Sequence, residues 1–260
     1  KEWWRMGIVV RNEHVKVQKV VALLAYKPEA LKIALGDYLD SFYVPPQRQL
    51  VALNLLLESK PVLLWGYHDL YYIDHAPWMC AGYQYGREEP YNLLLEGNIS
   101  RFKAAYAVDG WLCSHAGVVK KFLPRRKLSA DEVADLLNRK MAKYIKDRTW
   151  FNWLSIGSAR GGHNPVGGFL WFDHHRETGL VELPQIFGHT AGREPVVKDT
   201  LVCLDTTNVQ RKTWVWDTEE NRLVELETPF HIPQFSDLPE EEIEPFKQFL
   251  VSRSAPVGGY

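Results

Sequence analysis

The sequence predicts an α/β protein organised around a parallel β-sheet, and three features of its first seventy residues predict it. Short apolar runs typical of buried strands alternate with runs of helical spacing. Prolines end one expected helix and open the next at its tolerated first positions. The expected order is strand, helix, strand, helix, strand, over residues 6–10, 15–26, 30–35, 45–57 and 61–65. Each strand ends in polar residues, and ligands of such sheets bind at the carboxyl ends of the strands.

The rest of the chain predicts a long loop, a hairpin, two more helices and several strands. Residues 70–98, rich in Tyr, Pro and Gly, are expected to form a loop along one wall of a site. Asp109-Gly110 predicts a hairpin between strands at 102–108 and 111–114. An amphipathic helix is expected at 128–145, with Ser129 as its N-cap. Further strands are expected at 169–172, 183–187, 201–204, 211–216 and 222–226, then a helix at 238–250 and a loose tail from about 254.

The composition indicates a globular chain and argues against several classes of function. With 260 residues, 46% of them hydrophobic, the chain can bury a sizeable core, and we expect a single domain over residues 1–260. A net charge of −1 argues against binding to nucleic-acid duplexes. No apolar run reaches membrane-spanning length. Cys80, Cys113 and Cys203 are widely spaced among apolar residues, which favours buried thiols over a disulfide framework or a thiolate metal site. We therefore expect a soluble cytoplasmic protein that does not bind membranes.

The stretch from Ala34 to Asp40 follows the second expected strand. Gly36 permits a sharp turn there, so Asp37 and Asp40 would project from the rim of the sheet. Two carboxylates on a rigid strand end are suited to holding a cation or orienting a base. A turn with solvated carboxylates is the alternative, and the motif alone favours that plainer interpretation.

Histidine, aspartate or asparagine follows several expected strands. The set comprises Asn12, His14, Asp37, Asp40, His68, Asp69, His115 and His189. A single histidine is more often a structural residue than a ligand, but four of them at strand-to-loop corners favour a shared site. Mixed imidazole and carboxylate ligands suit Mn, Fe or Zn better than Ca. Two such ions side by side would clamp a phosphate and generate hydroxide as a nucleophile.

Five short stretches carry these residues in a fixed order. They are Asn12-Glu13-His14, Gly36-Asp37-Tyr38-Leu39-Asp40, Gly66-Tyr67-His68-Asp69, Ser114-His115-Ala116-Gly117 and Gly188-His189-Thr190. Their order and spacing resemble the calcineurin-like metallophosphoesterases, the superfamily that includes serine/threonine phosphatases and diadenosine tetraphosphatases. The resemblance covers roughly residues 6–204. It implies a metallophosphatase-like α/β sandwich, in which two mixed β-sheets pack face to face and helices lie outside.

The resemblance also implies a role for each matching position. Asp37 would bridge two metal ions. The positions expected to complete the two metal sites are Asn12 and His14 for one, and Tyr67, His115 and His189 for the other. His68 would protonate the leaving-group oxygen, held in its tautomer by Asp40. Arg160, in a Gly-rich loop, could contact phosphate, although an ordinary surface arginine fits it equally. The implied cofactors are two divalent ions, with Mn favoured and Fe or Zn as alternatives.

Three positions depart from the family's pattern. Asn12 stands in place of an aspartate and would weaken its metal site, because an amide brings no charge. Tyr67 stands in place of an asparagine, and a phenol of pKa about 10 coordinates well only once ionised. Ser41 stands where protein phosphatases often have an arginine for phosphate. The chain is then an active enzyme with an altered metal requirement, a degenerate member with one site weakened or empty, or a redesigned sequence.

Two hypotheses for function follow. The first is a metal-dependent phosphoesterase that hydrolyses a phosphate ester or anhydride through metal-activated water. Its substrate would be a small-molecule or nucleotide phosphate, or a phosphoprotein. The second is a protein of this fold with weak or no catalysis that binds a phosphorylated ligand or a protein partner. Asn12 and Tyr67 favour the second, while the retained histidines and aspartates favour the first. A metal-free nucleotide-binding module is disfavoured, because no Gly-x-Gly-x-x-Gly or Walker-type loop follows an expected strand.

Overall fold

The structure is a computed structural model of the chain, and it describes residues 7–10, 17–41, 44–74, 78, 80, 83, 86, 88–206 and 212–228. All of these residues lie in one compact unit, Lys1–Thr228. None of the helices in this part of the chain combines the length and the apolar composition needed to cross a membrane. The helix expected at 238–250 and the tail after it lie outside the described residues. A single domain over residues 1–260 therefore stays a prediction.

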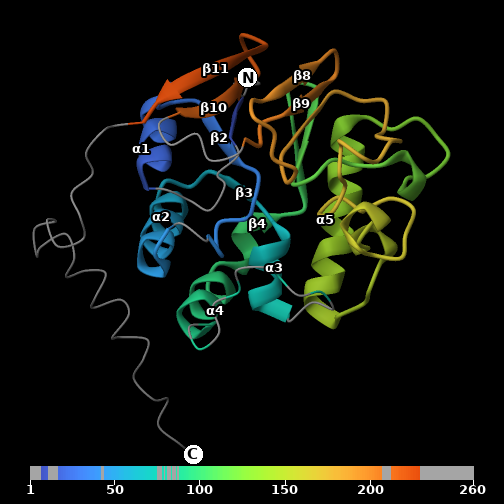
Figure 1. The fold of residues 1–260 in the computed structure, drawn as a ribbon, viewed down its shortest axis with the longest axis horizontal. Coiled ribbons are helices and arrows are strands. Elements are labelled where there is room, and N and C mark those ends of the chain that lie inside the picture. The colour runs from blue at the N-terminus through green and yellow to red at the C-terminus, as the bar shows by residue number, and fades with distance from the viewer. Residues whose placement is uncertain are drawn as a thin grey trace, which may run out of the picture. The chain divides into compact units, whose positions relative to one another are not determined.

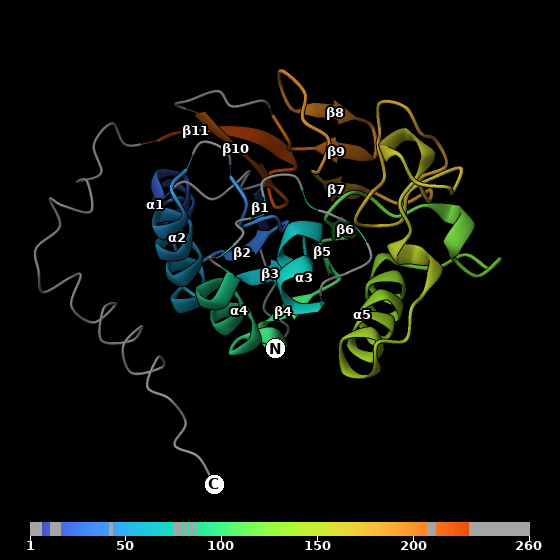
Figure 2. The same ribbon diagram turned by 60° about the horizontal axis from the view of Figure 1, so that its bottom comes forward.

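Two mixed β-sheets form the described unit. Six strands belong to the first sheet: β1 Gly7–Val10, β2 Leu31–Ala34, β3 Val62–Leu64, β4 Phe102–Lys103, β10 Lys212–Asp217 and β11 Arg222–Glu227. Five belong to the second: β5 Ala105–Val108, β6 Trp111–Ser114, β7 Gln185–Phe187, β8 Val196–Lys198 and β9 Leu201–Cys203. The spatial orders are β11-β10-β1-β2-β3-β4 and β5-β6-β7-β9-β8 (Figure 1 and Figure 2). Strands β1 to β4 run parallel, while the β10–β11 hairpin joins β1 antiparallel. The predicted α/β fold with two mixed sheets is confirmed.

The hydrophobic core lies between the two sheets. Strands of both sheets contribute to a single cluster: Val9, Ile33, Leu35, Leu64, Val108, Trp111, Cys113, Ile186, Val202, Leu204 and Trp216. Trp111 of β6 and Trp216 of β10 meet edge to face, with ring centroids 5.2 Å apart. Because one face of each sheet is buried against the other and helices flank the sheets, the parallel strands are continuous apolar runs. The three cysteines are buried and form no disulfide with one another, as predicted.

Helices flank the two sheets, with α1 and α2 on one side and α5 on the other (Figure 2). α1 Val17–Ala25 packs against β10, β11 and α2 Pro46–Glu58, and α5 Ala130–Asp147 packs against β5 and β6. The N-terminus of α5 carries a capping box. The Ser129 hydroxyl accepts the Glu132 N–H at 3.2 Å, and the Glu132 carboxylate accepts the Ser129 N–H at 2.9 Å. The predicted helix and its Ser129 cap are therefore confirmed.

The loop predicted over residues 70–98 is wrong, because two helices occupy much of that stretch. α3 Tyr67–Asp74 begins directly after β3, and α4 Glu88–Glu96 follows it. Tyrosine has only modest helix propensity, and here tertiary packing decides the structure. Tyr72 stacks on Tyr83 and meets Tyr91 edge to face, each with ring centroids 5.0 Å apart. These aromatic side chains pack on one another.

The strand predicted at 169–172 is also wrong. These residues form a turn, in which the Trp171 and Phe172 N–H groups both donate to the Gly168 carbonyl at 2.9 Å. The side chains of residues 169–172 are all buried. An apolar run of this length does not distinguish a buried turn from a buried strand, which explains the error.

The apolar run at 102–108 crosses from one sheet to the other. β4 pairs with β3 in the first sheet, and β5 pairs with β6 in the second, where the predicted hairpin is confirmed. Asn138 of α5 satisfies the backbone at the crossing: its carbonyl oxygen accepts the Ala104 N–H at 2.8 Å, and its amide donates to the Ala105 carbonyl at 2.9 Å. This one segment therefore ties both sheets to α5.

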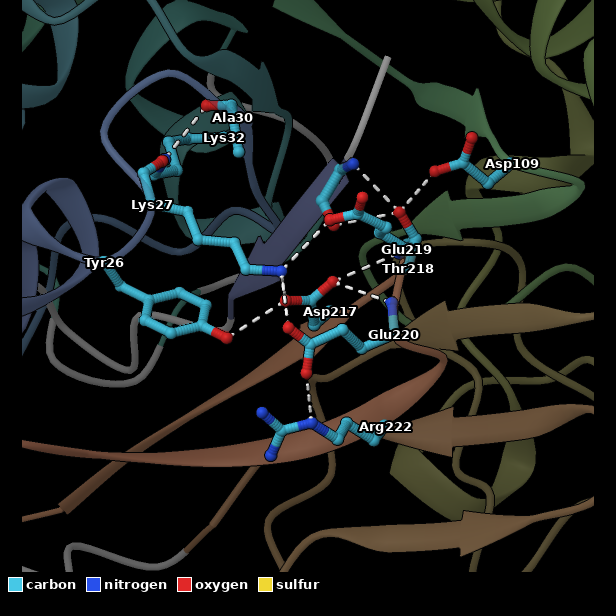
Figure 3. A network of polar contacts seen from close by, with 11 residues as sticks. Tyr26, Lys27, Ala30, Lys32, Asp109, Asp217, Thr218, Glu219, Glu220 and Arg222 are labelled. Carbon is cyan, nitrogen blue, oxygen red and sulfur yellow. Dashed lines mark hydrogen bonds and ion pairs between the residues drawn. The ribbon is translucent and has the colours of Figure 1, made fainter. Parts of the chain in front are cut away.

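A polar network fastens the turn after α1 to the turn between β10 and β11 (Figure 3). Lys27 Nζ lies 2.7 Å from Asp217 Oδ2 and 2.8 Å from Glu220 Oε1. The Tyr26 hydroxyl donates to Asp217 Oδ2 at 3.0 Å, and the N–H groups of Glu219 and Glu220 donate to Oδ1 at 3.1 Å. Burial of Asp217 opposes its charge, but Lys27 and the N–H donors outweigh burial and hold its pKa below the usual value.

Candidate metal centre

Loops that follow three strands, and the start of helix α3 after a fourth, bring the predicted residues to one rim of the sandwich. They carry Asp37 and Asp40 after β2, Tyr67 and His68 after β3, His115 after β6, and His189 after β7. Two of these strands belong to each sheet, so both sheets contribute side chains to the rim. The predicted ligands Asn12 and His14, which follow β1, lie outside the described residues.

The loops after β2 and β3 approach each other at two glycines. Gly36 has a φ of 93°, and a Cβ atom on it would lie 2.5 Å from the backbone nitrogen of Gly66. A Cβ atom on Gly66 would lie 2.1 Å from Asp37 Oδ1. Any larger residue at either position would push the loops apart, so both glycines are needed to form this part of the site.

The buried Asp69 carboxylate accepts hydrogen bonds from both of these loops. Its Oδ2 accepts the N–H groups of Asp37 at 2.8 Å and Gly66 at 3.0 Å, and its Oδ1 accepts the Tyr38 N–H at 2.8 Å. The bond to Gly66 is the one that an acidic residue in the first helical turn makes to the residue before the helix. Burial, and after it the charge of Asp37, raise the pKa of Asp69 although the N–H donors oppose the rise. Asp69 is therefore a positioning residue in a strongly negative environment.

Three residues of the rim hold strained backbone conformations. The φ angle is 58° at Asp37, 68° at Asp40 and 72° at His189, in the left-handed region that non-glycine residues seldom adopt. At His189 the strain belongs to a γ-turn, closed by the Thr190 N–H donating to the Gly188 carbonyl at 2.9 Å. Such conformations cost about 1–3 kcal/mol each and concentrate at functional sites.

Asp37, His115 and His189 form a group of candidate metal ligands. One ligand atom of each lies within 4.8 Å of the others, and all three residues are buried. His115 Nδ1 donates to the Leu35 carbonyl at 2.7 Å, which leaves Nε2 facing Asp37 Oδ2 at 3.2 Å. With Nδ1 as the donor, Nε2 is the atom left to share a metal cation with Asp37 Oδ2. A backbone carbonyl that fixes the far nitrogen in this way is typical of metal-binding histidines.

The N-terminus of α3 points at Asp37. The His68 N–H donates to Asp37 Oδ1 at 3.2 Å, and the positive end of a helix favours a carboxylate at that position. Asp37 is thus oriented from two sides, by the helix at one oxygen and by His115 at the other.

His68 and Asp40 form a buried hydrogen-bonded pair beside this group. His68 Nδ1 donates to Asp40 Oδ2 at 2.8 Å, and the Tyr72 hydroxyl donates to Asp40 Oδ1. Burial lowers the pKa of His68, but the surrounding carboxylates, with Asp37 first, outweigh burial and raise it. The pair therefore favours the imidazolium form, which can donate a proton.

The Tyr67 ring lies among the candidate ligands. Its centroid is 5.1 Å from the His189 ring, 5.9 Å from the His115 ring and 4.3 Å from the Trp171 ring. The structure thus places an aromatic ring beside the two histidines, at the position where the resemblance expects an asparagine. Coordination of a metal by Tyr67 stays a prediction.

Arg160 lies at the edge of the group. Its Nη2 donates to Thr190 Oγ1 at 2.7 Å, and its Nε lies 3.2 Å from Asp173 Oδ2. Thr190 follows His189 directly, so these contacts hold the guanidinium next to the rim with 31% of the side chain exposed. The contact of Arg160 with phosphate stays a prediction.

Three residues at the rim had no role predicted from the sequence. They are Asp69, Tyr72, and Cys80, which forms a second group of candidate ligands with Asp40 and His68. The position of Asp69 carried a signal, because an acidic residue in the first turn of a helix often bonds to the residue before the helix. No pattern in the sequence predicted a role for Tyr72 or Cys80, because tertiary packing alone brings them to Asp40.

The side chains of the first group suit a divalent transition-metal ion. One carboxylate and two imidazoles are ligands that Mn, Fe and Zn accept. Their burial, the fixed orientation of His115 and the close approach of Nε2 to Asp37 all agree with such an ion.

Comparison with known proteins adds evidence on the fold. No protein-family model matches the sequence, and no curated protein matches it. A solved structure described as a "putative diadenosine tetraphosphatase" aligns with a TM-score of 0.50 and 13% identity, over 88% of this chain and 96% of that chain. A metallophosphoesterase from Sphaerobacter thermophilus aligns with a TM-score of 0.41 and 13% identity, over 95% and 97% of the two chains. A protein of Thermus thermophilus, TT1561, aligns with a TM-score of 0.38 and 12% identity, over 86% and 99%.

At this level of identity the first alignment bears on the fold alone. It spans most of both chains, and it agrees with a fold of two mixed sheets flanked by helices. The resemblance to the calcineurin-like metallophosphoesterases is therefore confirmed for the fold.

Proposed function

We propose that this protein is a metal-dependent phosphoesterase, a hydrolase that cleaves a phosphate ester or anhydride with water as the nucleophile. One observation carries the proposal. A carboxylate with two histidines lies directly beside a hydrogen-bonded His–Asp pair on one buried rim. The His68 N–H also donates to Asp37, so the expected proton donor and the expected metal ligand are held in a fixed relation.

Asp37, His115 and His189 are the residues that would hold one divalent ion. Asn12 and His14, with Asp37 as the bridging residue, are the proposed ligands of a second ion. Manganese is our first expectation for this dinuclear site, with iron or zinc as alternatives. Ions of this kind supply Lewis acidity toward a phosphoryl oxygen and lower the pKa of water to near neutrality.

His68 would protonate the leaving-group oxygen. Its raised pKa favours the charged ring, and Asp40 binds Nδ1, so Nε2 is the nitrogen left to deliver a proton. Tyr72 fixes Asp40 from the other side. General acid catalysis of this kind contributes about 10²- to 10⁴-fold to a rate. Arg160, held beside His189 through Thr190, would place positive charge near the phosphate.

A nucleotide or other small-molecule phosphate is the substrate class that we place first. The matched structure described as a "putative diadenosine tetraphosphatase" supports a phosphate anhydride as the bond to test. A phosphoprotein substrate is the next candidate. The free, buried cysteines suit a reducing compartment, and a cytoplasmic location remains our expectation.

One observation favours a second candidate function. The Tyr67 ring lies beside both His115 and His189, close to the place where an ion bound by these residues would sit. If the ring keeps that ion out, the protein would be a weak or inactive member of the fold that binds a phosphorylated ligand or a protein partner. The same rim would then bind the ligand or partner without hydrolysing it.

Metal content and hydrolysis, measured on one sample of the full chain purified without chelators, test the proposal. We expect about two metal ions per chain by mass spectrometry, and turnover of p-nitrophenyl phosphate that increases with added Mn²⁺. Diadenosine tetraphosphate and a phosphopeptide would then be compared as substrates. Absence of bound metal, together with no turnover after Mn²⁺ addition, would contradict the phosphoesterase and favour the binding protein.

A further inference from the structure

Cys80 converges with the His–Asp pair in a second buried group of candidate ligands. Asp40, His68 and Cys80 each offer one ligand atom, and these atoms lie within 4.8 Å of one another. The three residues are only 0%, 3% and 5% exposed. Cys80 Sγ also lies 3.6 Å from the Tyr67 carbonyl, so the thiol is held against the first turn of α3. A carboxylate, an imidazole and a thiol therefore meet at the proposed proton donor.

This combination of donor atoms selects a particular class of metal ion. Thiolate, imidazole and carboxylate together are typical ligands of zinc, which binds them tetrahedrally. Manganese and magnesium prefer oxygen ligands and bind thiolates poorly. An ion held by Cys80 would therefore differ from the manganese that we place at Asp37.

The observed spacing is close to what zinc requires. Bond lengths of about 2.0 Å to nitrogen or oxygen and about 2.3 Å to sulfur place tetrahedral ligand atoms about 3.3–3.5 Å apart. His68 Nδ1 and Asp40 Oδ2 are 2.8 Å apart, and no pair in the group exceeds 4.8 Å. Tyr72 occupies the other oxygen of Asp40, which keeps Oδ2 turned toward His68.

The electrostatic environment of Cys80 favours a cation. Burial, and after it the charges of Asp37 and Asp40, raise the pKa of the Cys80 thiol. The negative field that disfavours the bare thiolate attracts a divalent ion, and a thiol that coordinates such an ion loses its proton outright.

We propose that Asp40, His68 and Cys80 form an inhibitory site for zinc or a similarly thiophilic divalent ion. Binding releases two protons to solvent, one from the Cys80 thiol and one from the His68 imidazolium. Two anionic ligands and a neutral ring then balance the charge of the ion. His68 no longer holds a proton acidic enough to deliver. The inhibition rests on the proposed function, whereas the metal site itself does not.

Cobalt spectroscopy on the full chain tests the site without any activity measurement. The protein is stripped with a chelator and titrated with Co²⁺. A cobalt–thiolate bond gives a charge-transfer band in the near ultraviolet that imidazole and carboxylate ligands do not give. We expect this band in the unaltered protein and its loss when Zn²⁺ displaces Co²⁺. Absence of the band in the unaltered protein overturns the proposal.

A pair of cysteine variants identifies the ligand. Cobalt should bind Cys80→Ala at least about tenfold more weakly and without the band, because losing even an outer partner costs a metal site about 10- to 100-fold in affinity. Cys113→Ala is the matched control, since Cys113 is also a free, buried cysteine but lies in the core between the sheets. It should keep the band. Persistence of the band in Cys80→Ala overturns the proposal.

Zinc inhibition tests the link to turnover. With hydrolysis of p-nitrophenyl phosphate supported by Mn²⁺, the zinc concentration for half-inhibition should rise at least about tenfold in Cys80→Ala, relative to the variant's own rate without zinc. Equal half-inhibitory concentrations in both proteins overturn the inhibitory role. If the unaltered protein shows no turnover at all, the phosphoesterase proposal fails, and the cobalt titration still decides the metal site.

Discussion

Two regions at opposite ends of β2 contain buried carboxylates. In one region the surroundings lower the pKa of the carboxyl group, and in the other they raise it. Before the strand, Lys27 lies 2.7 Å from the fully buried Asp217, whose pKa is held below its usual value. After the strand, Asp69 is equally buried, but burial and the charge of Asp37 raise its pKa. The same carboxylates raise the pKa of His68.

This difference distinguishes a structural charge cluster from a functional one. In the Lys27 network, an ammonium group and backbone N–H donors compensate the buried carboxylate, so the network is complete as it stands. At the rim, several carboxylates are crowded together with imidazoles and a helix N-terminus. A divalent cation would complete this second arrangement. Four predictions test the contrast.

The largest expected effect is that of Asp37→Asn, which removes the central charge of the rim. Asparagine tolerates the left-handed backbone at this position, so the fold should be kept. We expect loss of bound metal and a fall of at least about 1,000-fold in turnover of p-nitrophenyl phosphate, because the charge that anchors the ions is gone. Mass spectrometry and the hydrolysis assay measure the two effects.

Asp217→Asn is the matched control, because it neutralises a buried aspartate at the other end of β2. It should keep the metal content of the unaltered protein. Full metal stoichiometry in Asp37→Asn would contradict the assignment of the rim as a metal centre.

Manganese should stabilise the protein through the rim alone. At a free concentration about 100 times its dissociation constant, an ion that binds only the folded state adds about 2.7 kcal/mol to the free energy of unfolding. For a chain of this size that raises the Tm by about 5–10 °C. Differential scanning fluorimetry of chelator-stripped protein, with and without Mn²⁺, measures the shift.

Two variants localise this stabilisation. Lys27→Met should show the same Mn²⁺-dependent rise in Tm as the unaltered protein, and Asp37→Asn should show none. A rise in Asp37→Asn equal to that of the unaltered protein would mean that the ion binds elsewhere.

Removing the charge of Asp217 should lower stability rather than function. Asp217→Asn leaves the Lys27 ammonium facing a neutral amide. Breaking a fully buried pair costs about 3–5 kcal/mol, but 27% of the Lys27 side chain is exposed, so we expect a loss of about 2 kcal/mol. Urea unfolding at pH 7 measures the free energy of unfolding.

The pH dependence separates charge from packing in this variant. The pKa of Asp217 is lower in the folded protein, so its stabilisation is present above the usual aspartate value of about 3.8 and is lost as the pH falls below it. The pKa of Lys27 is raised, so its contribution is lost only at strongly alkaline pH. The stability difference between the two proteins should therefore be constant near neutrality and shrink below about pH 3.8. A difference that persists undiminished in strong acid would point to packing.

The smallest expected effect is that of Tyr67→Asn. Removing the ring that lies beside His115 and His189 should strengthen metal binding by up to about tenfold, or about 1.4 kcal/mol, if the ring obstructs the ion. Competition with a chromophoric chelator measures the affinity. Tyr67→Phe is the control: it should behave like the unaltered protein if the ring obstructs, and lose affinity if a phenolate coordinates. Equal affinities in all three proteins would show that Tyr67 does neither.

Those parts of the fold that depend on local pattern were predictable from the sequence. The apolar runs of β1, β2 and β3 and the Ser129 cap of α5 are local signals, and all of them are confirmed. Two helices that occupy much of residues 70–98 were missed, because mutual packing of tyrosines rather than propensity holds that region. The division of residues 102–108 between the two sheets was equally hidden, since it depends on Asn138, a distant residue of α5.

The rim was predictable where strand topology dictates it. Parallel strands place the residues that follow them at one edge, and Gly36 and Gly66 mark where two of those loops touch. That is why Asp37, His115 and His189 meet as the motifs implied. The position of Cys80 beside the His–Asp pair has no periodic signal in the sequence, because tertiary packing alone brings it there.

The pairing of β1 with β10 has a consequence for synthesis of the chain on the ribosome. β1 lies in the middle of its sheet, with Ile8 opposite Asp217, yet its neighbour β10 is among the last described segments to be made. At about 5–20 residues per second, the ribosome needs about 10–40 s to pass from one strand to the other. During that time β1 presents an apolar edge that can pair with another nascent chain. Closure of the six-stranded sheet is thus a late event in synthesis, and the edge of β1 stays open until β10 is made.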